Sequence, residues 1–186
     1  MIKRIKPKEL LAESLMELAK KHLIQSITVT DITENCQVSR QMFYYHFSSK
    51  YDLISWIYRD KADKIVEEYI EKEPWGKVAG RIIEFIKDDY IYFKKAFDDD
   101  THLSFYNIIY NYTVECHTKH ILKRTNKDIL PAEVLFAIRF NAYGGVNVTR
   151  DWLENGMKET PSELGELIYS AMPSSISPYF EAASRV

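Results

Sequence analysis

The fold is decided by two neighbouring stretches, Thr28-Val29-Thr30-Asp31-Ile32 and Val38-Ser39-Arg40-Gln41-Met42-Phe43-Tyr44-Tyr45-His46-Phe47. Thr28 or Thr30 can cap a short helix that runs to about Asn35, because a side-chain hydroxyl accepts a hydrogen bond from a free amide of the first turn. Ser39 can cap a second short helix, Arg40 to His46, in the same way. Two short capped helices joined by a three-residue turn predict a helix-turn-helix.

The second of these helices carries side chains that can identify bases. In a helix-turn-helix, the N-terminal residues of the second helix enter the major groove of DNA. Arg40 can form two hydrogen bonds with guanine, Gln41 can do the same with adenine, and Met42 can contact a thymine methyl group. The alternative is that Tyr44 and Tyr45 fill a hydrophobic core, as aromatic residues usually do. Periodicity alone leaves both interpretations open.

From Thr28 to Ile54 the sequence resembles the DNA-binding head of the TetR family of transcriptional regulators. The resemblance extends from Ile5 to about Tyr58, and the ending His46-Phe47-Ser48-Ser49-Lys50 is its most distinctive part. It implies DNA contacts at nine positions, which are Thr28, Thr30, Arg40, Gln41, Met42, Tyr44, Tyr45, His46 and Lys50. The base contacts are expected chiefly from Arg40, Gln41 and Tyr45, and the phosphate contacts from Thr28, Tyr44, His46 and Lys50. The core of the head is expected to contain Val29, Ile32, Val38, Phe43, Phe47 and Leu53.

The turn between the two helices departs from the family pattern. The usual Ala-Gly is replaced by Cys36-Gln37. Gln37 is therefore expected to adopt the backbone conformation that glycine usually supplies, at a modest cost in stability.

The rest of the chain has helical periodicity. An amphipathic helix is expected to begin near Pro7, and a long one to run from Ser49 to the region before Pro74. Further apolar stretches at helical spacing are Val78–Phe93, His102–Thr125, Pro131–Gly156 and a last helix introduced by Thr160-Pro161-Ser162-Glu163. The tail from Pro173 is expected to be irregular. We predict an all-α protein of about nine helices, with a head over residues 1–50, a linking helix from about 50 to 73 and a helical ligand-binding and dimerisation body over 51–186.

Charge is distributed unevenly between these parts. Residues 1–50 contain 8 Lys and Arg against 5 Asp and Glu, whereas the remainder contains 17 against 22. A basic head on an acidic body favours a polyanion as the partner of the head. The arm formed by Lys3, Arg4, Lys6 and Lys8 could reach phosphates or the minor groove, or it could be a solvated terminus.

Composition restricts where the protein works and what it does. Two cysteines in 186 residues cannot form a disulfide framework, and no stretch is apolar enough for a membrane span or a signal peptide, so a cytoplasmic location is expected. No glycine-rich phosphate loop or nucleophile motif is present. Cys116 and His120 are spaced for metal binding, but one helix supplies too few ligands. We therefore predict no catalytic residue, metal or cofactor, with an enzyme or a helical protein-interaction module without DNA binding as alternatives.

The resemblance implies a homodimer that packs through its last two long helices, here about Pro131–Asn155 and Ser162–Met172. The adjacent glycines Gly144 and Gly145 favour a close helix crossing, although a crossing within one chain or a kink would leave the same pattern. The residues expected at the dimer interface are Ile138, Ala142, Gly145, Thr149, Trp152, Leu164 and Ile168. Such a dimer would read a near-palindrome in double-stranded DNA.

The family's middle helices enclose an effector pocket, and the resemblance implies one here. The aromatic side chains of the body could line it or simply fill the core. The pocket candidates are Tyr106, Tyr110, Asn141 and Tyr143. The segment from Ala142 to Leu164 is similar to a C-terminal type found among TetR-like regulators of dihydroxyacetone kinase genes. The signal could come from a small-molecule effector or from a partner protein.

Overall fold

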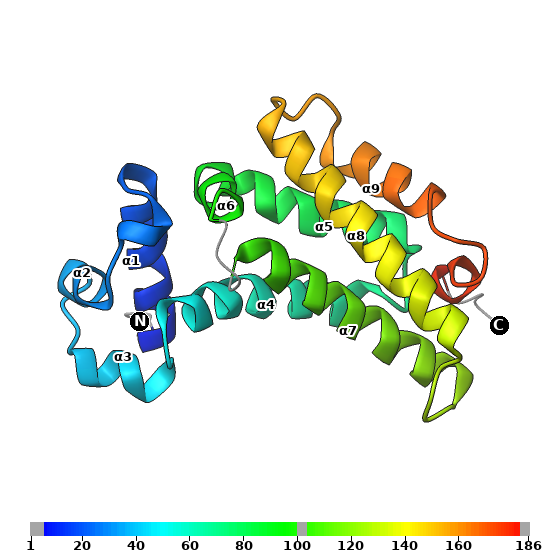
Figure 1. Ribbon diagram of the computed structural model, residues 1–186, viewed down its shortest axis with the longest axis horizontal. Helices are drawn as coiled ribbons and strands as arrows, with labels where there is room; N and C mark the ends of the chain where they lie inside the picture. The colour runs from blue at the N-terminus through cyan, green and yellow to red at the C-terminus, as the bar shows by residue number, and fades with distance from the viewer. Residues whose placement is uncertain (1–5, 100–103, 183–186) are drawn as a thin grey trace.

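The computed structural model describes residues 6–99 and 104–182, and these ranges contain nine α-helices, two short 3₁₀ helices and no strand (Figure 1). The α-helices are α1 (Pro7–Lys21), α2 (Val29–Asn35), α3 (Arg40–His46), α4 (Lys50–Tyr69), α5 (Trp75–Asp88), α6 (Tyr90–Phe97), α7 (Phe105–Thr125), α8 (Ala132–Glu154) and α9 (Pro161–Ser170). The 3₁₀ helices are η1 (Ile24–Ser26) and η2 (Ser177–Phe180). The prediction of an all-α fold is confirmed. Within the same ranges, no helix combines the length and the apolar character needed to cross a bilayer.

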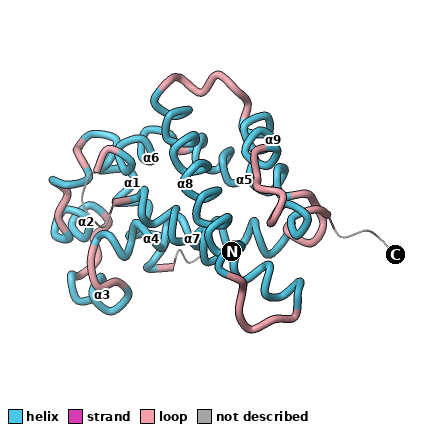
Figure 2. Tube along the Cα trace, turned by 45° about the vertical axis from the view of Figure 1, so that its right-hand side comes forward, coloured by secondary structure: helices cyan, strands magenta, loops and turns pink. Residues whose placement is uncertain are grey.

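The helices form a small head and a larger body that share α4. In Figure 1 the head, built from α1, α2 and α3, lies at the left, and α4 runs from it into the body. Helices α7 and α8 pack along one another, and α5 packs most extensively against α9. The view in Figure 2 shows α8 between the head and α9.

The head is held together by a core that α1 shares with the two short helices and the start of α4. Leu11 and Leu15 of α1 are fully buried, as are Ile32 of α2 and Phe43 of α3. The hydroxyl of Ser14 donates to the carbonyl oxygen of Ile32 at 2.7 Å, which fixes α2 on α1. Of the predicted core residues, Ile32, Phe43, Phe47 and Leu53 are buried, and Val29 and Val38 are partly buried against them.

The predicted helix starts are confirmed by their hydrogen bonds. The hydroxyl of Thr28 accepts from the amide of Asp31, that of Ser39 from Met42, that of Ser49 from Asp52 and that of Thr160 from Glu163. Each of these bonds satisfies an amide that has no partner within its helix.

The stretch from Val78 to Phe93 is not one helix, because the backbone leaves the helical conformation at Asp89. This break separates α6 from α5 and lets α6 pack against α1. The ammonium group of Lys95 on α6 then donates to the carbonyl oxygens of Lys20 and His22, at 3.1 and 3.3 Å. These carbonyls lie at the C-terminal end of α1, where no intrahelical donor remains.

The closest helix crossing lies between α5 and α9 and depends on three glycines. A Cβ atom on Gly165 would meet the carbonyl oxygen of Gly76 and would lie 2.5 Å from the nitrogen of Gly80. The crossing expected at Gly144 and Gly145 is absent from the described protomer: a Cβ on Gly144 would meet nothing within 4 Å, and one on Gly145 only a methyl group of Ile168 at 3.6 Å. The alternative of a close crossing within one chain is therefore not supported at these glycines, which line a cleft between α8 and α9, and a close crossing with a partner's helices stays a prediction.

The tail is ordered rather than irregular over its described residues. Ile176 is fully buried and Phe180, in η2, is 2% exposed. The ring of Phe180 lies 5.6 Å from that of Trp75 and 4.5 Å from that of His117, measured between centroids. The tail therefore completes the core of the body beside α5 and α7.

Candidate nucleic-acid interface

Helix α3 is anchored by its inner face and open on its outer face. Phe43 and the following Phe47 are buried in the head, whereas Arg40 and Gln41 are exposed. The exposed fractions of Tyr44 and Tyr45 are 52% and 82%, which excludes the interpretation that these rings fill the core. Met42 is exposed as well, and His46 is half-buried. The outer face thus presents guanidinium, amide and phenol groups to solvent.

The turn between α2 and α3 has the conformation expected from its sequence. Gln37 has φ +56°, in the left-handed region that glycine usually occupies. The amide of Val38 donates to the carbonyl oxygen of Thr33 at 3.0 Å, which closes the turn and directs α3 away from α2. Replacing the usual glycine with Gln37 thus preserves the geometry of the motif.

The start of α2 places Thr28 and Thr30 on the surface beside the turn that precedes it. The hydroxyl of Thr28 accepts from the amide of Asp31 and donates to its carboxylate at 2.6 Å. These hydrogen bonds with Thr28 lower the pKa of Asp31. Thr28 is exposed and Thr30 is half-buried, so a phosphate can reach the amides of this helix end beside them.

Lys50 has a structural role that its sequence position does not reveal. Its ammonium group donates to the carbonyl oxygens of Ile24, Gln25 and Ile27, at 2.8, 2.8 and 2.9 Å. Burial among these groups lowers its pKa. Lys50 was predicted as a phosphate donor, but in this structure its three donor positions are used to hold the η1 turn against α4.

The basic arm is only partly described. Lys3 and Arg4 lie outside the described residues, and Lys6 is exposed at the start of α1. The ammonium group of Lys8 lies 5.5 Å from the ring centroid of Phe47 and 5.7 Å from that of Trp56. This cation–π contact ties α1 to the end of the motif.

Two family descriptions match the chain. "Bacterial regulatory proteins, tetR family" matches residues 12–55, which span most of α1 to the first turns of α4. "Transcriptional regulator C-terminal region" matches residues 73–174, which is more than half of the chain. The chain belongs to the TetR family. It is therefore a DNA-binding transcriptional regulator, and the residues on the outer face of α3 lie in the part of the TetR fold that the first match covers.

Individual TetR relatives agree with this assignment. The HTH-type dhaKLM operon transcriptional activator DhaS of Lactococcus lactis subsp. lactis (strain IL1403) is 22% identical over 157 residues, which are 84% of each chain. A solved structure of the dihydroxyacetone kinase operon activator DhaS has a TM-score of 0.65 at 20% identity, covering 95% of this chain and 98% of that one. A TetR transcriptional regulator from Streptococcus agalactiae 2603V has a TM-score of 0.61 at 18% identity, covering 87% and 90%. These structures share the TetR fold with this chain, and the relatives are transcriptional regulators.

Three of the four residues expected in a TetR effector pocket lie together on the surface, and the fourth lies apart from them. Tyr110 and Tyr143 stack with ring centroids 4.3 Å apart at the junction of α7 and α8, and Tyr143 is half exposed. The amide of Asn147 donates to the hydroxyl of Tyr106 at 3.1 Å in the same region. Asn141 is buried and lies where α8 approaches α9, so it does not join the three tyrosines.

Cys116 and His120, which have a spacing suited to metal binding, take part in other interactions. The ring of His120 contacts the carbonyl oxygen of Tyr179 at 2.8 Å through Nε2. Burial raises the pKa of the Cys116 thiol to about 12, so it stays protonated at neutral pH. Among the described residues, no group of three potential metal ligands is found.

Most residues expected at the dimer interface are buried inside the protomer. Ile138, Ala142, Thr149, Trp152 and Leu164 are at most 7% exposed, and Gly145 and Ile168 are half-buried. They face the core because α8 packs on α7 and α9 on α5. This placement does not favour direct contacts between these five side chains and a partner.

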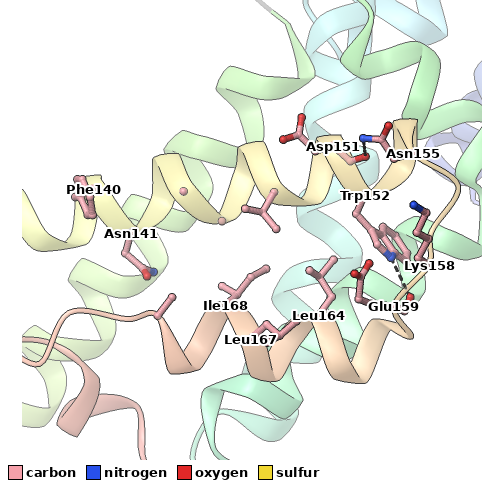
Figure 3. Close-up of a pocket in the computed structure, with 14 residues that line it drawn as sticks. Phe140, Asn141, Asp151, Trp152, Asn155, Lys158, Glu159, Leu164, Leu167 and Ile168 are labelled. Carbon is pink, nitrogen blue, oxygen red and sulfur yellow. Dashed lines mark hydrogen bonds between the residues drawn. The ribbon is translucent and has the colours of Figure 1, made fainter.

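The opposite face of α8 is apolar and exposed. Phe136, Phe140 and Tyr143 have exposed fractions of 70%, 65% and 50%, and Leu167 of α9 is 56% exposed. Between the two helices lies a cleft of about 600 Å³, in which Phe140 and Asn141 from α8 face Leu167 and Ile168 from α9 (Figure 3). The indole of Trp152 closes one end by donating to the carbonyl oxygen of Glu159 at 2.9 Å.

Proposed function

We propose that the protein acts as a homodimer in which two α3 helices read successive major grooves of a near-palindromic operator. The observation that carries this proposal is the outer face of α3, where Arg40, Gln41 and Tyr45 are exposed on a helix whose inner face is fixed by Phe43. Arginine and glutamine can each recognise one base pair through paired hydrogen bonds. Two-fold symmetry would repeat this contact about 34 Å along the duplex, or somewhat farther.

The nine predicted DNA contacts do not carry equal weight in this proposal. Thr28, Thr30, Tyr44 and His46 flank the reading face and suit phosphate positioning. Lys50 contributes indirectly, because it holds η1 and thereby the start of α2 in place. A protein that binds chromosomal DNA in this way works in the cytoplasm of a bacterium.

The exposed face of α8 and α9 supports the dimer. Phe136, Phe140 and Tyr143 recur at helical spacing along α8, and the exposed side chains of Val148 and Leu167 line the adjoining α8–α9 cleft. Soluble monomers rarely expose large contiguous apolar patches. Side chains from the same two helices of a second copy would cover this surface and enter the α8–α9 cleft.

Charge placed on this face is expected to separate the protomers. Leu167→Glu would bury a carboxylate without a partner in the interface, which costs several kcal/mol. Sedimentation velocity should then give the mass of one chain instead of two. Leu23→Glu is the matched control, since Leu23 is 63% exposed on the head and should leave the mass unchanged. An unchanged mass for Leu167→Glu would place the interface elsewhere.

Binding to DNA is tested most directly with duplexes from the region upstream of the protein's own operon. Gel-shift titration should give one specific complex containing two chains, with a scrambled duplex of equal length bound more weakly. The logarithm of the affinity should fall with the logarithm of the salt concentration, with a slope of about 0.9 for each phosphate contacted. Equal affinity for the specific and scrambled duplexes at every salt concentration would contradict sequence-specific reading.

We further propose that the regulated genes serve dihydroxyacetone metabolism. The support comes from the similarity to DhaS in sequence and in structure, since DhaS is described as an activator of a dhaKLM or dihydroxyacetone kinase operon. Either a small molecule bound in the body or a partner protein would supply the signal, by stabilising one spacing of the two heads over another. Titration with the promoter region of dihydroxyacetone kinase genes, against an unrelated promoter, tests this assignment.

A further inference from the structure

Helix α6 connects the body to the head at a second place besides α4. Apart from the continuous helix α4, the most extensive packing between a helix of the head and a helix of the body is that of α1 on α6. In Figure 1, α6 lies at the end of the body nearest to the head. Helix α6 also packs on α8, which carries the proposed dimer face. It therefore lies between the helix that would join two protomers and the first helix of the head.

The inner side of α6 is fixed in the body by aromatic packing. Tyr92, Phe93 and Phe97 are all buried. The ring centroid of Phe93 lies 5.1 Å from that of Phe85 on α5 and 5.1 Å from that of Phe105 on α7. Closely packed interiors compress little and transmit a displacement to their neighbours. Helix α6 is therefore expected to move together with the body.

Lys95 reaches from α6 to the head. Its ammonium group donates to the carbonyl oxygens of Lys20 and His22, at 3.1 and 3.3 Å. Helix α1 ends at Lys21, so both acceptors lie at a helix end that has no further amide donors of its own. The helix dipole also favours a positive charge at this end. Lys95 thus bonds a body helix to the end of α1 that precedes η1.

The residues that follow α6 place charge near the elements on both sides. Burial lowers the pKa of Lys50, which holds η1, and the carboxylate of the buried Asp99 opposes this effect. On the other side, the hydrogen bond with Glu154 raises the pKa of Arg150 on α8, and the charge of Asp98 adds to it. The end of α6 is therefore close to the η1 region of the head and to α8.

We infer that Lys95 is a positioning residue, which fixes the orientation of the head on the body and thereby selects the distance between the two half-sites of the operator. The inference rests on the proposed function, because only a dimer with two heads can measure a distance along a duplex. Helix α4 joins the head to the body at one place, and an attachment at a second place restricts tilting of the head about the first. Recognition of the bases within one half-site remains with α3.

Operator duplexes that differ only in the spacer between their half-sites test this assignment. Each base pair added moves one half-site by about 3.4 Å and rotates it about the duplex axis. The wild type should prefer one spacer over spacers that are one or two base pairs longer or shorter. In Lys95→Met, the ratio between the affinities for the preferred and the altered spacers should fall by about 3-fold to 30-fold, since one helix-end contact is lost in each of two protomers.

Two further variants separate positioning from the loss of a charge. Lys94→Met is the matched control, because Lys94 is the preceding residue, is exposed and carries the same charge. It should keep the spacer preference of the wild type. Lys95→Arg should keep it as well, because a guanidinium group can donate to both carbonyl oxygens. An equal change in Lys94→Met and Lys95→Met would overturn the inference.

The ratio between spacers also distinguishes positioning from a structural role. If Lys95 only stabilised the fold, Lys95→Met would weaken binding to every duplex by the same factor, and the ratio between spacers would stay at the wild-type value. Such a result would overturn the inference. Thermal unfolding of each variant, followed by circular dichroism, shows that the duplexes are compared on folded protein.

The orientation of the head can be measured without DNA. Nitroxide labels are attached through Glu34→Cys on α2 and Lys87→Cys on α5, which are exposed positions, in a full-length chain with Cys36→Ala and Cys116→Ala. Labelled chains are diluted with unlabelled ones, so that electron–electron resonance records distances within one chain. Lys95→Met should broaden the distribution of these distances.

The two measurements can fail separately. If the wild type showed no preference for any spacer, the proposed reading of a near-palindrome by a dimer would be contradicted. If the distance distributions of the wild type and Lys95→Met were equal, the role of Lys95 would be overturned, whatever the result with DNA.

Discussion

Arg40→Ala is expected to weaken binding to the operator by about 30-fold to 20,000-fold. A paired hydrogen bond between arginine and guanine is worth about 1–3 kcal/mol of base discrimination. A symmetric dimer makes the contact twice, so the loss is about 2–6 kcal/mol, and each 1.4 kcal/mol is a factor of ten. Arg40 is exposed at the first position of α3, so the change should leave the fold intact. Fluorescence anisotropy with a duplex selected from a random pool measures the loss.

Arg40→Lys is the matched control for this prediction. Lysine keeps the positive charge but lacks the planar fork that pairs with guanine. The salt dependence should therefore stay close to that of the wild type, while the preference for guanine at one position of each half-site is reduced. If Arg40→Ala changed neither the affinity nor the preference at any position, α3 would not be the reading helix.

Gly165→Ala is expected to produce the largest loss of stability. The added methyl group would lie against the backbone of α5, at the carbonyl of Gly76 and the nitrogen of Gly80, and backbone cannot move aside as a side chain can. Overpacking typically costs about 1–3 kcal/mol and occasionally more, and we expect about 3 kcal/mol here. For a chain of this length, the unfolding temperature should fall by about 6–12 °C, which thermal unfolding by circular dichroism can measure.

Gly76→Ala provides the comparison within the same crossing. The three atoms nearest to its methyl group would belong to the carboxylate of Glu166, which is the end of a flexible side chain and can move aside. The loss of stability caused by Gly76→Ala should therefore be small. If both substitutions lowered the unfolding temperature equally, the α5–α9 crossing would have room for a methyl group on Gly165.

Much of the head could be predicted from sequence because its signals are local. The caps at Thr28, Ser39 and Ser49 depend on residues three positions away, and the positive φ of Gln37 depends on the length of the turn. The exposed face of α3 follows from the same spacing, once Phe43 is placed in the core. For Lys50, no local pattern indicates that three carbonyl oxygens 23 to 26 residues earlier accept hydrogen bonds from its ammonium group.

The body was harder to predict because α8 is apolar on two faces. The stripe that contains Ile138 and Ala142 faces the protomer's own core, whereas the stripe that contains Phe136 and Phe140 faces outwards. Helical spacing identifies both stripes and cannot distinguish them, since the difference depends on which helices pack nearby. The glycines of the α5–α9 crossing were missed for the same reason: Gly76 and Gly165 are distant in sequence and meet only in the fold.

The position of Phe180 affects how the protein folds during synthesis. Phe180, which encloses His117 on one side, is made after every α-helix of the head and of the body. Protein domains generally fold in the order in which they emerge. The head can therefore take shape while the body is still being translated, but the body can reach its final packing only once η2 has been made.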